Sequence, residues 1–489
     1  MLVLAILTMS SLHAQLKLAG IFSDNMVLQQ NQKVKIWGTA DAGASVKIKA
    51  SWNGIANAMA NDMGEWETFI RTPKAGNNSY QLTIISNNDT ISLKNVVTGE
   101  VWVCSGQSNM RFQLRRSKGV EKDTLLANNS QIRLYASSKV GWEESTYKIA
   151  SQFSAVGFYF GLNIQKKLNV PVGLILSAVG GSPIESYIPL ETLQNDPKLS
   201  VVIDRRNQWL AEYKEKDSLE YYSQLSKWEA NGKKGKEPSI PRSVYSIKRY
   251  HHQRGILFKD QVSLFIPYTM KGVIWYQGES NMEWPNEYEH LLSSLITSWR
   301  KAWDQGDFPF YFVQIPSYNY PTKNGVDRSL NAPILREAQY RTLKLKNTGM
   351  AGTMDVGNPE NIHPNIKKPI GERLAYIALA KTYGFKSIAY SGPTYKKYSV
   401  NNNKVTVEFD HAKNGLVANG GEALWFEIAG TDGVFHPAKA KMARSKAIVS
   451  SNSVLKPKSI RYAWKAECVT NVFNVEGLPA IPFFVEVID

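Results

Sequence analysis

Short segments of alternating apolar and polar residues fill the first part of the chain. Between residues 15 and 95 they are separated by turn-forming clusters such as "ADAG", "NDMG" and "KAGNN". Alternation with a period of two indicates strands with one buried face, and regular turns between them favour antiparallel pairing. The segments are "KVKIWG", "SVKIKA", "EWETFIRT" and "SYQLTIIS". We therefore predict an N-terminal β-sandwich over residues 15–95.

Between residues 96 and 385, continuous apolar runs alternate with segments of helical periodicity. The runs are "VVTGEVWVCSG", "VPVGLILSAV", "KGVIWYQ", "FPFYFVQI" and "TGMAGTMDV", and the helical segments are "SQFSAVGFYFGLNIQKKL", "NEYEHLLSSLITSWRKAW", "PILREAQYRTLKL" and "PIGERLAYIALAKTY". Strands alternating with helices require crossover connections, which give a parallel sheet covered on both faces. We predict an α/β domain with a doubly wound parallel sheet here. Its charged insertion at 191–249 is expected to be a surface excursion or part of the rim above a site.

Alternation returns in the last part of the chain. "NKVTVEFD", "EALWFEIAG" and "KAIVSS" are separated by turns rich in asparagine. This pattern predicts a second all-β domain over residues 386–489. A length of 489 residues agrees with about three domains, each with its own core.

The N-terminus carries an apolar run that is typical of a secretory signal. Residues 1–14 are too few to span a bilayer, and they end on Ala14 with Leu12 at the −3 position, although a charged start is missing. No later stretch approaches the roughly 18 uninterrupted apolar residues that a membrane span needs. We therefore expect a signal peptide at 1–14, a secreted or periplasmic protein, and no membrane span.

Composition narrows the classes of partner. Cys104 and Cys468 are the only cysteines, which excludes a disulfide framework, and the place of Cys104 in an apolar strand predicts a buried free thiol. The net charge is +16, but the lysines and arginines are scattered rather than gathered in a stripe, so we expect no nucleic-acid partner. The excess of positive charge fits an acidic small substrate or ordinary surface charge. A surface protein that binds polyanions stays an alternative. Motifs for metal hydrolysis or nucleotide binding are missing, so neither a metal nor a cofactor is expected.

Residues suited to acyl transfer follow several of the predicted strands. Ser108 follows the first in "CSGQSNM", Gly180 and Gly181 the second, Asn281 the third in "WYQGESN", and His363 the fifth in "DVGNPENIHP". Ligands of open parallel sheets bind beyond the carboxyl ends of the strands. A hydroxyl, an imidazole and several N–H donors at one edge provide a nucleophile, a base and an oxyanion site. Each residue alone also suits a helix cap or a turn, and only their joint occurrence favours a site.

These blocks, "CSGQSNM … GGSPIES … IWYQGESN … NIHP", resemble those of the SGNH (GDSL-like) hydrolase superfamily. Their wording is similar to its sialate O-acetylesterase branch, which is related to acetylxylan esterases. The likeness extends to both flanks, in "LAGIFSDNMVLQQNQKVKIWGTADAG" and "NVEGLPAIPF". The resemblance implies an SGNH hydrolase domain between two β modules, with Ser108 as the nucleophile and His363 as the base. It further implies that Gly181 and Asn281 join the backbone N–H of Ser108 in the oxyanion hole.

The sequence departs from the superfamily pattern at the acid. That pattern has an aspartate three residues before the histidine, and this chain has Glu360 there. The longer glutamate still suits the task of orienting His363, and we expect it to do so. The alternative is a Ser–His dyad in which a backbone carbonyl orients the imidazole. Asp355 is a further candidate, but its distance along the chain favours a role in tying down the loop.

The expected substrate is an O-acetylated carbohydrate, first O-acetylated sialic acid and second acetylated xylan or another plant glycan. Gln107 and Gln277 suit the hydroxyl groups of a sugar, and Arg336 is expected to pair with a carboxylate of the substrate. A glycan-binding protein without catalytic activity is the alternative from another class. The sequence does not predict the oligomeric state.

Overall fold

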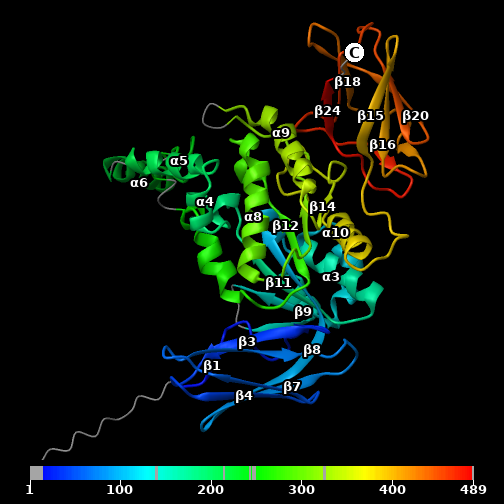
Figure 1. The fold of residues 1–489 in the computed structure, drawn as a ribbon. Helices are drawn as coiled ribbons and strands as arrows, with labels where there is room; N and C mark the ends of the chain where they lie inside the picture. The colour runs from blue at the N-terminus through cyan, green and yellow to red at the C-terminus, as the bar shows by residue number, and fades with distance from the viewer. Residues whose placement is uncertain are drawn as a thin grey trace, which may run out of the picture.

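The structure is a computed structural model that describes residues 15–137, 141–212, 215–241, 244, 249–322 and 326–486. The predicted signal peptide at 1–14 lies outside the described residues. Figure 1 shows an N-terminal β layer, a central α/β unit and a C-terminal β unit in chain order. The molecule is thus a mixed α/β protein with a central mixed sheet and further all-β sheets.

Two facing sheets form the N-terminal layer. One has the order β1–β3–β6, and the other joins β5, β4 and β7 to the first half of β8. Side chains alternate as the sequence predicts, since Val46, Ile48 and Ala50 of β4 are buried while the residues between them are exposed. The strands are β1 (Lys17–Leu18), β2 (Val27–Gln29), β3 (Lys33–Thr39), β4 (Ser45–Ala50), β5 (Gly54–Met59), β6 (Glu65–Arg71) and β7 (Tyr80–Ser86).

A single long strand, β8 (Asp89–Gly106), joins this layer to the central sheet. Its first residues pair with β7, its middle pairs with β2, and its last residues lie between β11 and β12. The boundary predicted after Asn95 therefore falls inside a strand. Asn95 has a φ of 53°, and the register with β7 shifts beside it, so this residue marks a β-bulge that redirects the strand rather than a linker.

The central sheet has the order β10–β9–β11–β8–β12–β13–β14. Every neighbouring pair in it is parallel except β9 and β10. The chain leaves β8 first toward β9 and β11 and later toward β12, so the strand order reverses at β8. The strands are β9 (Asn129–Ala136), β10 (Trp142–Ser145), β11 (Val172–Ala178), β12 (Gly272–Tyr276), β13 (Phe310–Val313) and β14 (Thr348–Ala351).

Helices cover both faces of this sheet. Trp102 and Cys104 of β8 pack in the core formed with α3 and α10, whereas Val101 and Val103 pack in the core that includes α8. In Figure 1, α8 lies on one side of the central strands and α3 and α10 on the other. Cys104 is a buried free thiol, as predicted. The helices are α2 (Tyr147–Ala150), α3 (Ala155–Leu168), α8 (Tyr288–Trp303), α9 (Arg328–Arg341) and α10 (Lys368–Lys381).

The described part of the insertion includes three helices, and these extend away from the sheet (Figure 1). They are α4 (Leu190–Asn195), α5 (Ser200–Ala211) and α6 (Glu215–Ala230). Most residues of α5 and α6 are partly or fully exposed. Within the described part of the chain, no helix is both long enough and apolar enough to cross a membrane.

The C-terminal unit consists of short antiparallel strands around its own core, which includes Val405, Val407, Ile428 and Ile460. The first sheet is β15 (Thr394–Asn401), β16 (Lys404–Asp410), β21 (Lys446–Ser450) and β20 (Lys439–Ala443). The second is β19 (Phe435–Pro437), β18 (Phe426–Ala429), β22 (Ser459–Tyr462) and β24 (Phe483–Glu486), and β17 (Leu416–Ala418) pairs with β23 (Val472–Asn474).

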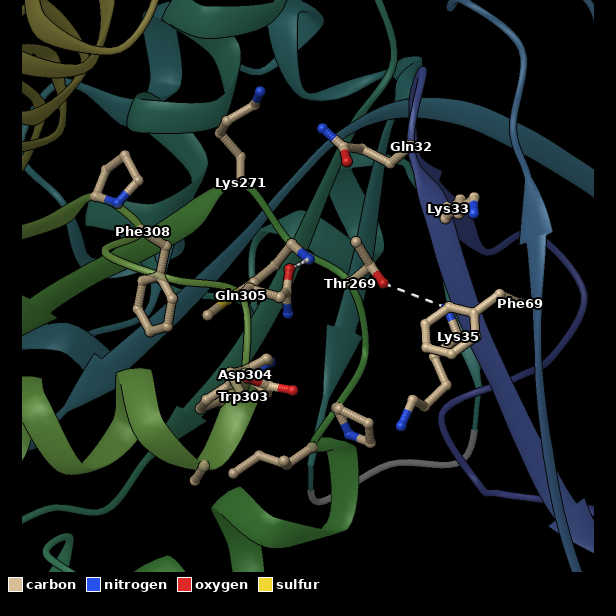
Figure 2. A pocket seen from close by; sticks show the side chains of 15 residues that line it. Gln32, Lys33, Lys35, Phe69, Thr269, Lys271, Trp303, Asp304, Gln305 and Phe308 are labelled. Atoms are coloured by element: carbon tan, nitrogen blue, oxygen red, sulfur yellow. Dashed lines mark hydrogen bonds between the residues drawn. The ribbon is translucent and has the colours of Figure 1, made fainter.

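A cavity of about 540 Å³ lies where the N-terminal layer meets the central unit (Figure 2). Lys33 and Lys35 of β3 line it together with Thr269 of the segment that leads into β12, and the Lys35 backbone N–H lies 3.4 Å from Thr269 Oγ1. Lys35 is paired with Glu67, and Lys271 lies 3.7 Å from a carboxylate oxygen of Glu100. The cavity sits at the amino ends of β12 and β13, the sheet edge opposite to the one where Ser108 lies.

Candidate active site

Ser108 stands where β8 turns into the short helix α1 (Ser108–Arg111). Gly106 has a φ of 133°, and a Cβ atom there would lie 2.2 Å from the carbonyl oxygen of Tyr276, so only glycine fits. The Gln107 N–H donates to the same carbonyl at 2.9 Å. This close approach of β8 to β12 ends the strand and places Ser108 at the carboxyl edge of the sheet.

His363 reaches Ser108 from the loop between β14 and α10. Its Nε2 lies 2.8 Å from Ser108 Oγ, within hydrogen-bond distance. The Asn361 side chain accepts the His363 backbone N–H at 2.9 Å and so fixes the turn that presents the imidazole. Two residues 255 positions apart in the chain therefore meet above the sheet, as a nucleophile and its base require.

The surroundings of His363 favour its neutral form. Burial lowers the pKa of the imidazole, and the positive charges of Lys367 and Arg116 lower it further. No carboxylate contributes to this shift. A neutral imidazole at neutral pH is ready to accept the proton of Ser108.

Glu360 does not contact His363. Its side chain is exposed, and among the described residues its only polar contact is a backbone one, from its N–H to Asn358 Oδ1 at 2.9 Å. The expectation that Glu360 orients the imidazole is therefore wrong for this structure, because the turns built on Asn358 and Asn361 leave its carboxylate at the surface. Asp355 pairs with Arg373 at 2.6 Å and ties down the loop, as expected. No described residue bonds to His363 Nδ1, which fits the alternative of a Ser–His dyad.

Backbone N–H groups for an oxyanion lie next to Ser108. Neither Ser108 nor Gly181 donates its N–H to another described residue, and both line the same pocket. Gly181 has a φ of 73°, which suits glycine, and a Cβ atom on Gly180 would lie 3.6 Å from Ser108 Cβ. The turn after β11 thus packs directly against the nucleophile.

Asn281 and Gln277 face away from this pocket. Asn281 donates to Glu185 Oε2 at 2.8 Å, and its Oδ1 accepts from the Ile184 N–H and from Gln277 Nε2. Gln277 is fully buried, and Tyr288 donates to its side-chain oxygen at 2.7 Å. The roles expected for Asn281 in the oxyanion hole and for Gln277 in sugar binding are not supported, because both amides instead connect the loops after β11 and β12.

Gln107 does line the pocket. Its Oε1 faces the N–H groups of Gly278 at 3.4 Å and Ser280 at 3.3 Å. These contacts orient the amide so that its N–H groups, which no described residue accepts, are left for a ligand. Gln107 thus lines the pocket beside Ser108, whereas Asn281 does not.

Arg336 is not a substrate residue. It is fully buried in α9 and donates to the carbonyl oxygens of Ile315, Pro316, Lys465 and Ala466 at 2.6 to 3.1 Å. The expected pairing with a substrate carboxylate is wrong, because the guanidinium joins the central unit to the C-terminal unit. Four of the five N–H donors of the guanidinium are used in this way.

The pocket above Ser108 has a volume of about 450 Å³. Its rim includes Arg249 at the end of the insertion, His252 just after it, and Arg328 from the start of α9, which were not among the candidate residues. The insertion is thus part of the rim, one of the two alternatives predicted for it. The lining is Gln107, Ser108, Gly180, Gly181, Arg249, His252, Glu279, Ser280, Met282, Glu283, Arg328, Ile362 and His363. Within the described residues, no three His, Cys, Asp or Glu side chains gather in a way that would hold a metal ion.

The chain is similar to known carbohydrate acetylesterases. The family profile described as "Carbohydrate esterase, sialic acid-specific acetylesterase" matches residues 98–214 and 225–380. The sialate O-acetylesterases of Mus musculus and Homo sapiens are 27% and 25% identical to the chain over 78% of its length and 76% and 74% of theirs. The crystal structure of a carbohydrate acetylesterase from Xanthomonas citri has a TM-score of 0.80 at 27% identity, over 96% of this chain and 99% of that one.

Replacing Arg336 tests its structural role. Arg336→Lys keeps the charge but cannot reach four carbonyl oxygens, so we expect the free energy of unfolding to fall by about 2 to 4 kcal/mol, measured by urea denaturation. The activity of the folded fraction should stay within about twofold of the wild type. Arg341→Lys, a half-exposed arginine of the same helix, is the control and should change stability by less than about 0.5 kcal/mol. Weaker substrate binding with unchanged stability would contradict this assignment.

Proposed function

The chain belongs to the carbohydrate esterase family of sialic acid-specific acetylesterases, and from this membership we propose that it removes O-acetyl groups through an acyl-enzyme on Ser108. The observation that carries the proposal is the 2.8 Å contact between Ser108 Oγ and His363 Nε2 at the floor of an open pocket. The strand order that reverses at β8, with helices on both faces, supports a doubly wound sheet of the SGNH type.

The proposed mechanism uses the groups at this edge of the sheet. His363 takes the proton of Ser108, and the hydroxyl oxygen attacks the carbonyl carbon of the acetyl ester. The N–H groups of Ser108 and Gly181 and the side-chain amide of Gln107 stabilise the negative oxygen of the tetrahedral intermediate. His363 then protonates the departing sugar oxygen, and a water molecule, activated in the same way, releases acetate.

We propose an O-acetylated sialic acid as the preferred substrate. Arg249 and Arg328 place guanidinium groups on the rim, and guanidinium pairs well with the carboxylate that sialic acids carry. The names of the mouse and human relatives point to the same sugar. Acetylated xylan is the second candidate, since the Xanthomonas citri protein is described only as a carbohydrate acetylesterase.

Export is proposed on sequence grounds. The apolar residues 1–14 and their Ala14 end support a secreted or periplasmic protein. The family concerns acetylated carbohydrates, and extracellular or periplasmic glycans are substrates that such an enzyme would meet there.

Ser108→Ala tests the function. Without the nucleophile, we expect hydrolysis of a chromogenic acetate ester to fall by at least about a thousandfold. Mass spectrometry of acid-quenched wild-type enzyme should find an acetyl group on the peptide that contains Ser108. Ser293→Ala, on α8 away from the pocket, is the matched control and should keep the wild-type rate. An active Ser108→Ala enzyme would remove the proposed function.

Glu360→Gln tests the dyad. Because the Glu360 carboxylate does not contact His363, we expect kcat to stay within about twofold of the wild type. Steady-state kinetics on the same ester measure this directly. A fall of tenfold or more, equivalent to about 1.4 kcal/mol, would show instead that Glu360 reaches the imidazole during the reaction.

The rates of acetate release from two substrates test which acetylated sugar the enzyme prefers. We expect a higher kcat/KM on O-acetylated sialic acid than on acetylated xylan, and Arg328→Gln should lower only the former, by about tenfold. Arg341→Gln, at the other end of α9, should alter neither value. Faster release from xylan, or an equal effect of Arg328→Gln on both substrates, would favour a neutral glycan.

A further inference from the structure

The loop that carries His363 is fastened to α1 by Asn109, the residue next to Ser108. Asn109 is fully buried, and its Nδ2 donates to the carbonyl oxygen of Ile362 at 3.0 Å and to Glu279 Oε1 at 2.6 Å. An amide nitrogen has two hydrogens, so both are used. One side chain therefore connects the nucleophile, the loop after β12 and the residue that precedes the base.

Lys367 completes the connection from the other side of His363. Its Nζ donates to Asn109 Oδ1 at 2.6 Å, and the whole side chain is buried. The ammonium group lies 4.9 Å from the ring centroid of Phe112 and 5.2 Å from that of Tyr276, distances at which an aromatic face attracts a cation. Ile362, just before His363, and Lys367, four positions after it, thus both form hydrogen bonds with the side-chain amide of Asn109.

We propose that Asn109 and Lys367 are positioning residues for His363, and that Asn109 orients the base, a task that falls to the acid in a catalytic triad. Asn109 holds the loop so that Nε2 stays within reach of Ser108, and the ammonium group of Lys367, held on the same amide, adds to the effect of burial in lowering the basicity of His363. The inference rests on the proposed function, because it assigns roles to residues that act through the proposed base.

The charges around the base support this assignment. Burial lowers the pKa of Lys367 to about 7, and the Glu279 carboxylate opposes the shift. Glu279 is buried, which raises its pKa, and its second oxygen has no partner among the described residues. A cation near His363 weakens it as a base, but it also makes the imidazolium a better acid toward the departing sugar oxygen.

Other charged groups bear on the pH dependence as well. Arg116 is the second cation that lowers the pKa of His363. Arg249, His252, Glu283 and Arg328 line the same pocket. The test must therefore remove the charge of Lys367 alone and leave these groups in place.

Lys367→Gln is the first test, because glutamine keeps a donor for Asn109 and loses the charge. Removing a cation raises the pKa of His363, so less of the imidazole is neutral in acid. We expect the acidic limb of the kcat/KM profile to move to higher pH by at least about 0.5 unit. Lys367→Arg, which keeps the charge, should restore the wild-type limb.

Asn109→Ala tests the positional role. We expect kcat to fall at least about tenfold while KM stays within about twofold, because the variant disturbs the base and leaves the rim intact. Lys368→Gln is the matched control for Lys367→Gln, because Lys368 is the neighbouring residue, pairs with Asp123 at 3.0 Å and is half exposed. Its profile should coincide with that of the wild type.

An acidic limb that does not move in folded Lys367→Gln would overturn the role of Lys367, and a kcat within about twofold of the wild type in folded Asn109→Ala would overturn that of Asn109. Thermal melting confirms that each variant is folded. If Lys367→Gln does not fold, Lys367→Met, which suits the neighbouring rings, carries the same pH measurement with the same two outcomes. Activity of Ser108→Ala would remove the proposed function itself, whereas an unmoved limb removes only the role of Lys367.

Discussion

The continuous backbone pairing of β8 is the constraint on which the rest of the structure depends. This strand pairs first with β7 and β2 and then with β11 and β12, so it forms backbone hydrogen bonds in both the N-terminal layer and the central sheet. Its carboxyl end stands at the point where the strand order reverses, and the loops of neighbouring strands diverge there. Ser108 lies at this end, and Gly181 and Glu279 approach from either side.

Neutral amides hold the loops around that point. Asn109 connects α1 to the loops that carry Glu279 and His363, and Asn281 connects the loop after β12 to the one after β11. An amide donates at one end and accepts at the other, so it joins two loops without adding a charge beside the reacting groups. Buried carboxylates in their place would stabilise the imidazolium but would also raise the pKa of the base.

The order of strands and helices predicted the α/β centre, the two β units and the strand ends from which Ser108 and His363 project. These features follow from periodicity, which reports the path of the backbone. Periodicity does not report where a polar side chain points once a strand has ended. Gln277 is therefore buried, although Glu279 and Ser280, shortly after it in the chain, line the pocket. Arg336 donates to carbonyl oxygens of the central and C-terminal units instead of facing a substrate. The strand β9 escaped prediction because its first three residues are polar and Arg133 interrupts its apolar part.

The insertion has a consequence for how such an enzyme can change. It ends at the mouth of the pocket with Arg249, while the reacting groups stand on loops of the sheet itself. The helices α4, α5 and α6 extend outward and share little of the central core. Selection can therefore exchange or reshape this appendage to admit a new sugar while the ester chemistry beneath it is inherited intact.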